Sequence, residues 1–583
     1  MKRLSLLLCL LGFQFSLFAQ KTPYENSGQQ ATATWAEAIE YYQQLAAQHP
    51  QIRLIERGKT DVGKPLHTVI VSKEGLTDPL QARAQGRRIL LVNNGIHPGE
   101  PCGVDASMML ARDLMEKAEM KALLNEVVIV IIPLYNIGGS LNRSSYSRAN
   151  QVGPAEYGFR GNARNFDLNR DFIKADTRNA RSFFEIFQDW QPDVFIDTHT
   201  TNGADYPAVM TLIATQSDKL GPETKRYQDE VLTPAMYEWM AYKKQKMCPY
   251  VNSIGTTPDK GIAAFMDSPR YSTGYTALFQ TMSFVTEAHM LKSFAERVEA
   301  TYVFLEGMIR HLAKNPKTAE VVQNDRNAAA TQKTFDIQWT IDTSEVDQLW
   351  FDGYEAKYKK SEVSGLDRLY YDRNAPWRKQ IPFLQRYKAT NTVEAPTAYI
   401  IPQGNDRVIE RLALNGVVMK TLSTDIKLPV EVSYIEDRKT STRSYEGHFY
   451  HQQFTSRKEQ QEIQFYAGDK VVFINQWRNP LIVHTLEPES QDAYFRWNFF
   501  DGILMQKEYF SSYVFEDEAA RLLKERPELK AKLDKAIAEN PKMAENSRAQ
   551  LNFIYFHSEY YEKTHNRYPV ARWLGADALP LDD

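Results

Sequence analysis

The stretch RILLVNNGIHPGE, residues 88–100, decides the fold class of this 583-residue chain. It opens with an apolar run, Ile89 to Val92, typical of a strand that is buried on both faces. A tight turn at Pro98-Gly99 follows, and apolar residues then recur at helical spacing over 104–118. A buried strand, a short turn and an amphipathic helix together favour an α/β fold.

The same alternation continues along the chain. Apolar strands are expected at 127–133, 193–199 and 281–288, and a helix at 180–190. We therefore predict an α/β domain whose mostly parallel or mixed sheet is sandwiched by helices. Ligands of such sheets bind beyond the carboxyl ends of the strands, so the polar residues there are the first candidates for a site.

Composition excludes several classes of function. The chain carries 70 Lys and Arg against 73 Asp and Glu, and this balance gives no field to attract nucleic-acid phosphates. With only Cys9, Cys102 and Cys248, it has neither a disulfide framework nor a cysteine zinc site. Any metal must be held by histidines and carboxylates, and whether Cys102 and Cys248 form a disulfide stays open.

The first residues have the pattern of a secretory signal peptide. The apolar run Leu4 to Ala19 follows Lys2-Arg3 and is too short to span a hydrocarbon core of about 30 Å comfortably. We expect cleavage after Ala19, which would leave a secreted or periplasmic protein without a stable membrane anchor.

The rest of the chain is expected to form two domains. A catalytic domain is predicted over 20–320, and the polar stretch 313–333 is the candidate linker. Alternating aromatic segments and a charged helical stretch follow, so residues 335–583 are predicted to form a mixed α+β accessory domain. No recognisable chemistry occurs there, and the sequence does not identify a partner.

Three residues have the types and positions of a catalytic zinc site. His97 and Glu100 stand three residues apart on the turn after the first strand, and His199 ends another predicted strand. A catalytic zinc ion needs three such nitrogen or oxygen ligands and one position left for water. We predict one zinc ion per chain on these three side chains.

Two further groups carry chemistry. Glu287 ends the apolar run 281–288, where a carboxylate is costly to bury unless a cation or an activated water faces it, so it is the candidate general base. His289 is its rival, and a buried ion pair is the structural alternative. Asn169 and Arg170 can bind a carboxylate through directional and bidentate hydrogen bonds, although a surface salt-bridge network would use the same residue types.

Together these motifs resemble the zinc carboxypeptidase family over about residues 30–315. The four family elements occur in order: His97-Pro-Gly-Glu100 as the H-x-x-E metal pair, Asp167-Leu-Asn169-Arg170 as the D-x-N-R motif, His199 as the third ligand and Glu287 as the catalytic glutamate. The family's Asn-Pro-Asp-Gly turn is replaced by Asn136-Ile-Gly-Gly139, so the pocket loops are expected to differ.

The resemblance implies roles for further residues. Asn169 and Arg170 would bind the terminal carboxylate of the substrate, and Asp167 would orient His97. Arg148 would stabilise the oxyanion, with Arg143 and Arg160 as competitors. Tyr271 and Tyr275 are both candidates for the substrate-capping tyrosine.

The predicted activity is zinc-dependent removal of the C-terminal residue from peptides with a free carboxylate, with Glu287 accepting the proton of the metal-activated water. One alternative is an amidase or endopeptidase that acts on cell-wall peptides or acylated amino acids. The other is a non-catalytic extracellular binding protein on the same fold.

Overall fold

The computed structural model describes residues 20–582, and the predicted signal peptide at 1–19 lies outside them. The α/β prediction is confirmed, and the main sheet is mixed. Its eight strands lie in the order β1 (Ile52–Lys59), β2 (Pro65–Val71), β4 (Val127–Ile132), β3 (Arg88–Asn93), β5 (Val194–Thr201), β10 (Met282–His289), β6 (Met210–Ala214) and β7 (Met247–Pro249). The central strands β4, β3, β5 and β10 are parallel, whereas β2 and β6 pair antiparallel to their central neighbours.

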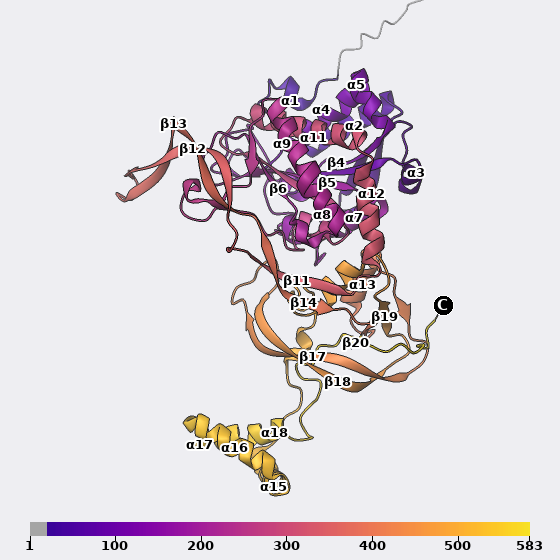
Figure 1. Ribbon diagram of the computed structural model, residues 1–583, viewed down its shortest axis with the longest axis vertical. Helices are drawn as coiled ribbons and strands as arrows, with labels where there is room; N and C mark the ends of the chain where they lie inside the picture. The colour runs from indigo at the N-terminus through magenta and orange to yellow at the C-terminus, as the bar shows by residue number, and fades with distance from the viewer. Residues whose placement is uncertain (1–19, 583) are drawn as a thin grey trace, which may run out of the picture.

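Helices cover both faces of this sheet, because alternate residues of its strands point to opposite sides. Leu90 and Val92 of β3 pack in one core, and Ile89 and Leu91 pack in the other. One face carries α2 (Trp35–Gln48), α4 (Cys102–Glu116), α9 (Thr233–Tyr242) and α11 (Phe294–Lys314), and the other carries α7 (Arg178–Trp190) and α10 (Ser272–Ala277). The parallel pairing places the carboxyl ends of β3, β5 and β10 side by side. Figure 1 shows the helices around the sheet strands β4, β5 and β6.

The expected linker at 313–333 is wrong. Most of it forms α12 (Lys317–Ala329), which packs against α8 (Pro222–Tyr227) of the catalytic domain. Val321 and Val322 are buried, and the Asp325 carboxylate accepts a hydrogen bond from the Thr224 main-chain N–H at 2.7 Å. Two buried valines and one hydrogen bond therefore hold α12 against the catalytic domain, although the composition of the helix is that of a solvent-exposed segment.

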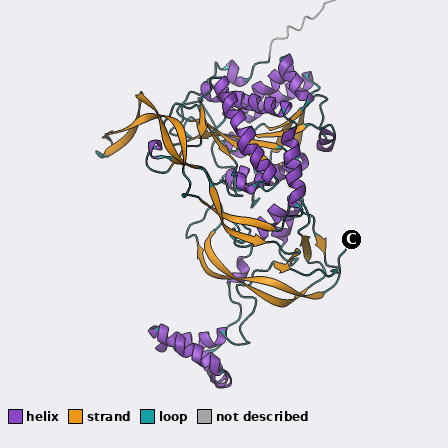
Figure 2. Ribbon diagram, in the orientation of Figure 1, coloured by secondary structure: helices purple, strands orange, loops and turns teal. Residues whose placement is uncertain are grey.

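The region after α12 has three parts (Figure 2). The long hairpin of β12 (Asp347–Lys360) and β13 (Asp367–Leu384) projects from the body and pairs with β9 (Ile262–Ala263) of the catalytic domain. A six-stranded sheet follows, in the order β16 (Lys420–Thr421), β19 (Lys470–Phe473), β15 (Ala398–Ile401), β20 (Ala571–Trp573), β17 (Ile426–Thr440) and β18 (His451–Phe465). A helical lobe with its own core is inserted before β20: α15 (Ser512–Glu525), α16 (Pro527–Glu539), α17 (Pro541–Ala544) and α18 (Ser547–Phe556).

The C-terminal sheet shares a core with the catalytic domain. One continuous cluster of buried apolar residues joins Phe183 and Tyr275 on the main sheet's second face to Tyr399 and Trp497 of the C-terminal region. The strands β11 (Thr334–Ile341) and β14 (Tyr387–Glu394), with α13 (Asp406–Leu414), lie at this junction (Figure 1). Apolar residues of α14 (Asn479–Leu486) belong to the same core. The C-terminal sheet is therefore packed against the catalytic domain rather than tethered to it.

Two sequence questions are answered by the described residues. Cys102, which is buried, and Cys248 are not joined by a disulfide. Across residues 20–582, no helix combines the length and the apolar character that a membrane crossing requires.

Candidate active site

Three strand ends bring the predicted site residues together. The turn after β3 carries His97 and Glu100, β5 carries His199, and β10 places Glu287 directly opposite His199 in the parallel register. All four side chains line one cavity of about 360 Å³. Residues far apart in the sequence thus meet at the carboxyl edge of the sheet, as expected for an α/β fold.

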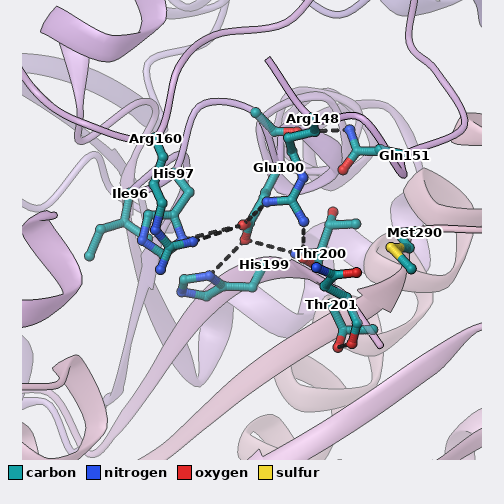
Figure 3. Close-up of polar contacts among 12 residues, drawn as sticks. Ile96, His97, Glu100, Arg148, Gln151, Arg160, His199, Thr200, Thr201 and Met290 are labelled. Carbon is teal, nitrogen blue, oxygen red and sulfur yellow. Dashed lines mark hydrogen bonds and ion pairs between the residues drawn. The ribbon is translucent and has the colours of Figure 1, made fainter. Parts of the chain in front are cut away.

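His97, Glu100 and His199 form the candidate metal site. One ligand atom from each lies within 4.8 Å of the others, and all three residues are buried. Glu100 lies at the centre of the group (Figure 3). Its carboxylate is 3.3 Å from His97 Nδ1 and 2.9 Å from His199 Nδ1. The Nδ1 atoms of both rings therefore face the same carboxylate.

A second carboxylate lies beside each imidazole. Asp167 Oδ1 lies 2.9 Å from His97 Nε2, and Asp197 Oδ2 lies 3.3 Å from His199 Nε2. Sequence reasoning missed Asp197, although a signal was present: it stands two residues before His199 in the same strand, so both side chains point to one face. Outer carboxylates of this kind fix the orientation and raise the basicity of ligand histidines.

The charges of the cluster fit a bound cation. Burial would raise the pKa of Glu100, but Arg148 and the two histidines outweigh it and hold that pKa well below its usual range. Burial likewise opposes the charged form of His199, yet Asp197 and Glu100 raise its pKa well above the usual value. The carboxylates thus favour positive charge at His199, and among residues 20–582 the buried His97 Nδ1 atom has no hydrogen-bond partner. The donor set of two histidines and one glutamate suits zinc.

Glu287 has the environment of a proton acceptor. It lines the cavity, and no ion pair involving it is formed among residues 20–582, so the predicted alternative of a buried salt bridge is not observed. Burial raises the pKa of Glu287 to about 7, with His199 opposing the shift and Glu100 adding to it. A carboxyl group with a pKa near neutrality can both take and return a proton.

His289, the rival of Glu287, is buried away from the cavity. Its Nε2 lies 3.4 Å from the Asp205 carboxylate, and its ring stacks on Tyr206 at a centroid distance of 4.2 Å. His289 is therefore a buried core histidine whose contacts with Asp205 and Tyr206 are structural.

The three candidate arginines differ in whether they line the cavity. Arg143 donates to the main-chain oxygens of Thr32 and Glu156 and does not line the cavity. Arg148 and Arg160 both line it (Figure 3). Arg148 donates to Glu100 and to the Thr200 main-chain oxygen, whereas Arg160 pairs with Asp167 at 2.8 Å and lies 3.6 Å from Glu100.

The D-x-N-R motif lies at the same cavity. The Asn169 Oδ1 atom accepts a hydrogen bond from the Ser272 main-chain N–H at 3.0 Å, which leaves its Nδ2 to donate to a ligand. The Arg170 guanidinium lies 4.5 Å from the centre of the Tyr271 ring, and both residues line the cavity. An amide and a guanidinium on one wall provide the donors that a carboxylate requires.

Of the two candidate tyrosines, Tyr271 lines the cavity and Tyr275 does not. The prediction that Tyr275 contacts substrate is wrong, because this residue is fully buried. Its ring stacks on Phe184 at 4.7 Å, and its hydroxyl donates to Asn415 Oδ1. Tyr275 is the fourth residue of α10, and the helix turns it toward the core while Tyr271, which precedes the helix, faces the cavity.

Two histidines and a glutamate beside an unpaired carboxylate are the groups that metal-dependent hydrolases use. The family model described as "Zinc carboxypeptidase" matches residues 38–268. This part of the chain belongs to the zinc carboxypeptidase family, a family of peptide hydrolases, as the sequence motifs predicted.

Individual relatives are distant. "Carboxypeptidase 2" of Trichophyton equinum is 21% identical over 419 residues, covering 69% of this chain and 72% of that protein. "Probable carboxypeptidase 2" of Trichophyton verrucosum (strain HKI 0517) is 29% identical over 109 residues, 18% of each chain. Among solved structures, carboxypeptidase A from Helicoverpa armigera is similar at 12% identity and a TM-score of 0.38, covering 50% of this chain and 74% of that one.

Proposed function

We propose that this protein is a zinc metallocarboxypeptidase that removes the C-terminal residue of peptides with a free carboxylate. The observation that carries the proposal is one cavity lined by three groups: the candidate metal ligands, the proton acceptor Glu287, and the carboxylate donors Asn169 and Arg170. The family match to residues 38–268 supports the same reaction class.

In this proposal each group has one task. His97, Glu100 and His199 would hold the zinc ion, which when bound lowers the pKa of water to about 7 and polarises a carbonyl. Glu287 accepts a proton from the attacking water and returns it to the leaving amine. Asn169 and Arg170 bind the substrate carboxylate and so fix which peptide bond is cleaved. Tyr271 covers the bound residue from the wall next to Arg170.

Matched peptides that differ only at their C-termini test this proposal. The purified wild-type protein should cleave the free acid at least ~30-fold faster than the amide, since the amide leaves the Arg170 guanidinium without its partner. Equal cleavage of both peptides would favour an amidase or endopeptidase. No cleavage of either by the zinc-loaded protein would favour the binding-protein alternative.

The His199→Ala variant should lose most of its zinc, because two remaining ligands make a weak site. Elemental analysis of dialysed protein measures the effect, against about one zinc ion per wild-type chain. His289→Ala is the matched control, because that histidine lies outside the cavity. Retention of a full zinc equivalent by His199→Ala would remove this residue from the ligand set.

The two cavity arginines are expected to differ in what they stabilise. We assign the oxyanion role to Arg148, so Arg148→Ala should lower kcat about 10²- to 10³-fold on free-acid peptides. Arg160 pairs with the aspartate that orients His97, so Arg160→Ala should mainly weaken zinc binding. Steady-state kinetics and zinc content of both variants separate these roles, and the reverse pattern would transfer the oxyanion role to Arg160.

We also propose that the chain is exported. The support is the sequence pattern of residues 1–19, with Ala19 at the expected cleavage position. N-terminal sequencing of the exported protein should begin at Gln20. A membrane-bound form that keeps Met1 would contradict this proposal.

A further inference from the structure

The residues that line the catalytic cavity all come from the first 290 residues of the chain. The C-terminal sheet domain nevertheless contacts the D-x-N-R segment, residues 167–170, from behind. The turn 445–448 contacts it directly through Glu446, and Asp492 acts on it indirectly through Arg270. Neither contact is used by the proposed mechanism.

The first contact is a hydrogen bond from the main-chain N–H of Asp167 to Glu446 Oε2, 2.9 Å long. Asp167 is the residue that orients His97, and its Oδ1 also accepts the Asn169 main-chain N–H at 2.9 Å. Glu446 therefore holds Asp167, the N-cap residue of the short helical turn Leu168–Arg170. Burial raises the pKa of Glu446, although the Asp167 N–H opposes that shift.

Glu446 lies in a tight turn of the backbone, residues 445–448. Glu446 and Gly447 both have positive φ, 48° and 77°, and Tyr445 and His448 exchange main-chain hydrogen bonds across them. A non-glycine residue in the left-handed region is strained and persists where surrounding contacts hold it. The turn is held by His448, whose Nε2 lies 2.6 Å from the Asp176 carboxylate of the catalytic domain.

The second contact passes through Arg270. Asp492 is fully buried and accepts hydrogen bonds from the Arg270 guanidinium Nε at 2.9 Å and from its main-chain N–H at 3.0 Å. The guanidinium also lies over the rings of Tyr450 and Trp497 at 4.7 and 4.8 Å. Two residues further on, the Ser272 N–H donates to Asn169 Oδ1. Asp492 thus fixes the segment that orients the Asn169 amide and carries Tyr271.

We propose that Glu446 and Asp492 are positioning residues, through which the C-terminal sheet domain sets the carboxylate-binding wall of the active site. Glu446 holds Asp167 directly, whereas Asp492 acts on Asn169 through Arg270 and the Ser272 N–H. According to this inference, the C-terminal sheet domain contributes to substrate binding by positioning residues 167–170. The inference rests on the proposed carboxypeptidase function.

The test compares three glutamate variants of the full-length, zinc-loaded protein. Glu446→Ala should raise KM for a free-acid peptide about 10-fold, with a smaller change in kcat and an unchanged zinc content. Glu446→Gln should recover most of the affinity, because its amide oxygen still accepts the Asp167 N–H. Glu410→Gln is the matched control, since the exposed Glu410 also pairs across the domain boundary, with Arg181 of α7. In the described residues, neither member of this pair hydrogen-bonds residues 167–170.

Amide hydrogen exchange gives a readout that does not depend on activity. Glu446→Ala should speed exchange within residues 162–172 without doing so in β3 or β5. Asp492→Asn is the second variant, and we expect the same segment and residues 268–272 to exchange faster.

Unchanged KM and unchanged exchange in Glu446→Ala would overturn the inference, as would an equal rise in KM in Glu410→Gln. If wild type cleaved free-acid and amidated peptides equally, the proposed function would fail instead. The exchange measurement would still decide whether Glu446 holds the segment.

Discussion

Replacing Glu287 by glutamine should lower kcat by at least ~10³-fold while the protein keeps one zinc ion. The amide occupies the same volume at the end of β10 but cannot accept the proton of the attacking water. Glu287 is not one of the three clustered candidate ligands. Among residues 20–582, the only other carboxylate that lines the cavity is the candidate ligand Glu100. No neighbouring group is therefore placed to replace it.

Turnover of a free-acid peptide and zinc content, measured on the same preparation, check this expectation. Glu56→Gln is the control, because Glu56 is an exposed glutamate of β1. If Glu287→Gln lost zinc together with activity, Glu287 would be a ligand rather than the proton acceptor. If it kept wild-type turnover, the general base would be another group.

The second large effect is expected from Arg170→Ala. Removing the guanidinium should erase the preference for free-acid over amidated peptides, a loss on the order of 2 to 5 kcal/mol for the free acid, or roughly 30-fold or more in rate. Cleavage of the amidated peptide should change little, since it presents no charge for Arg170 to bind.

The kinetics of both substrates, measured on the variant and on wild type, give the result. Arg164→Ala is a matched control: its guanidinium donates to the Asp176 main-chain oxygen, and it does not line the cavity. A preference for the free acid that survives in Arg170→Ala would assign carboxylate binding to a different group.

Much of the site could be predicted because its residues lie at strand ends. Apolar runs locate the strands, and parallel pairing brings their carboxyl ends together, so His97, His199 and Glu287 could be grouped from a linear pattern. Asp197 obeys the same rule but was not predicted, although the alternation of side chains along β5 places it on the same face as His199.

Other features depended on packing that a linear pattern does not contain. Tyr271 and Tyr275 stand four residues apart, and only the start of α10 between them decides that one faces the cavity and the other the core. Glu446 lies 279 residues after Asp167, in a region without recognisable motifs. The shared core of the two domains and the packing of α12 likewise arise from long-range contacts.

The most direct test of the zinc carboxypeptidase account is mass spectrometry of one unblocked peptide during digestion by the wild-type protein. The account predicts a ladder of products that lose residues one at a time from the C-terminus, with no internal fragments. Chelation of zinc should stop the ladder, and added zinc should restore it. Internal fragments, or a ladder that continues in the metal-free protein, would contradict the account.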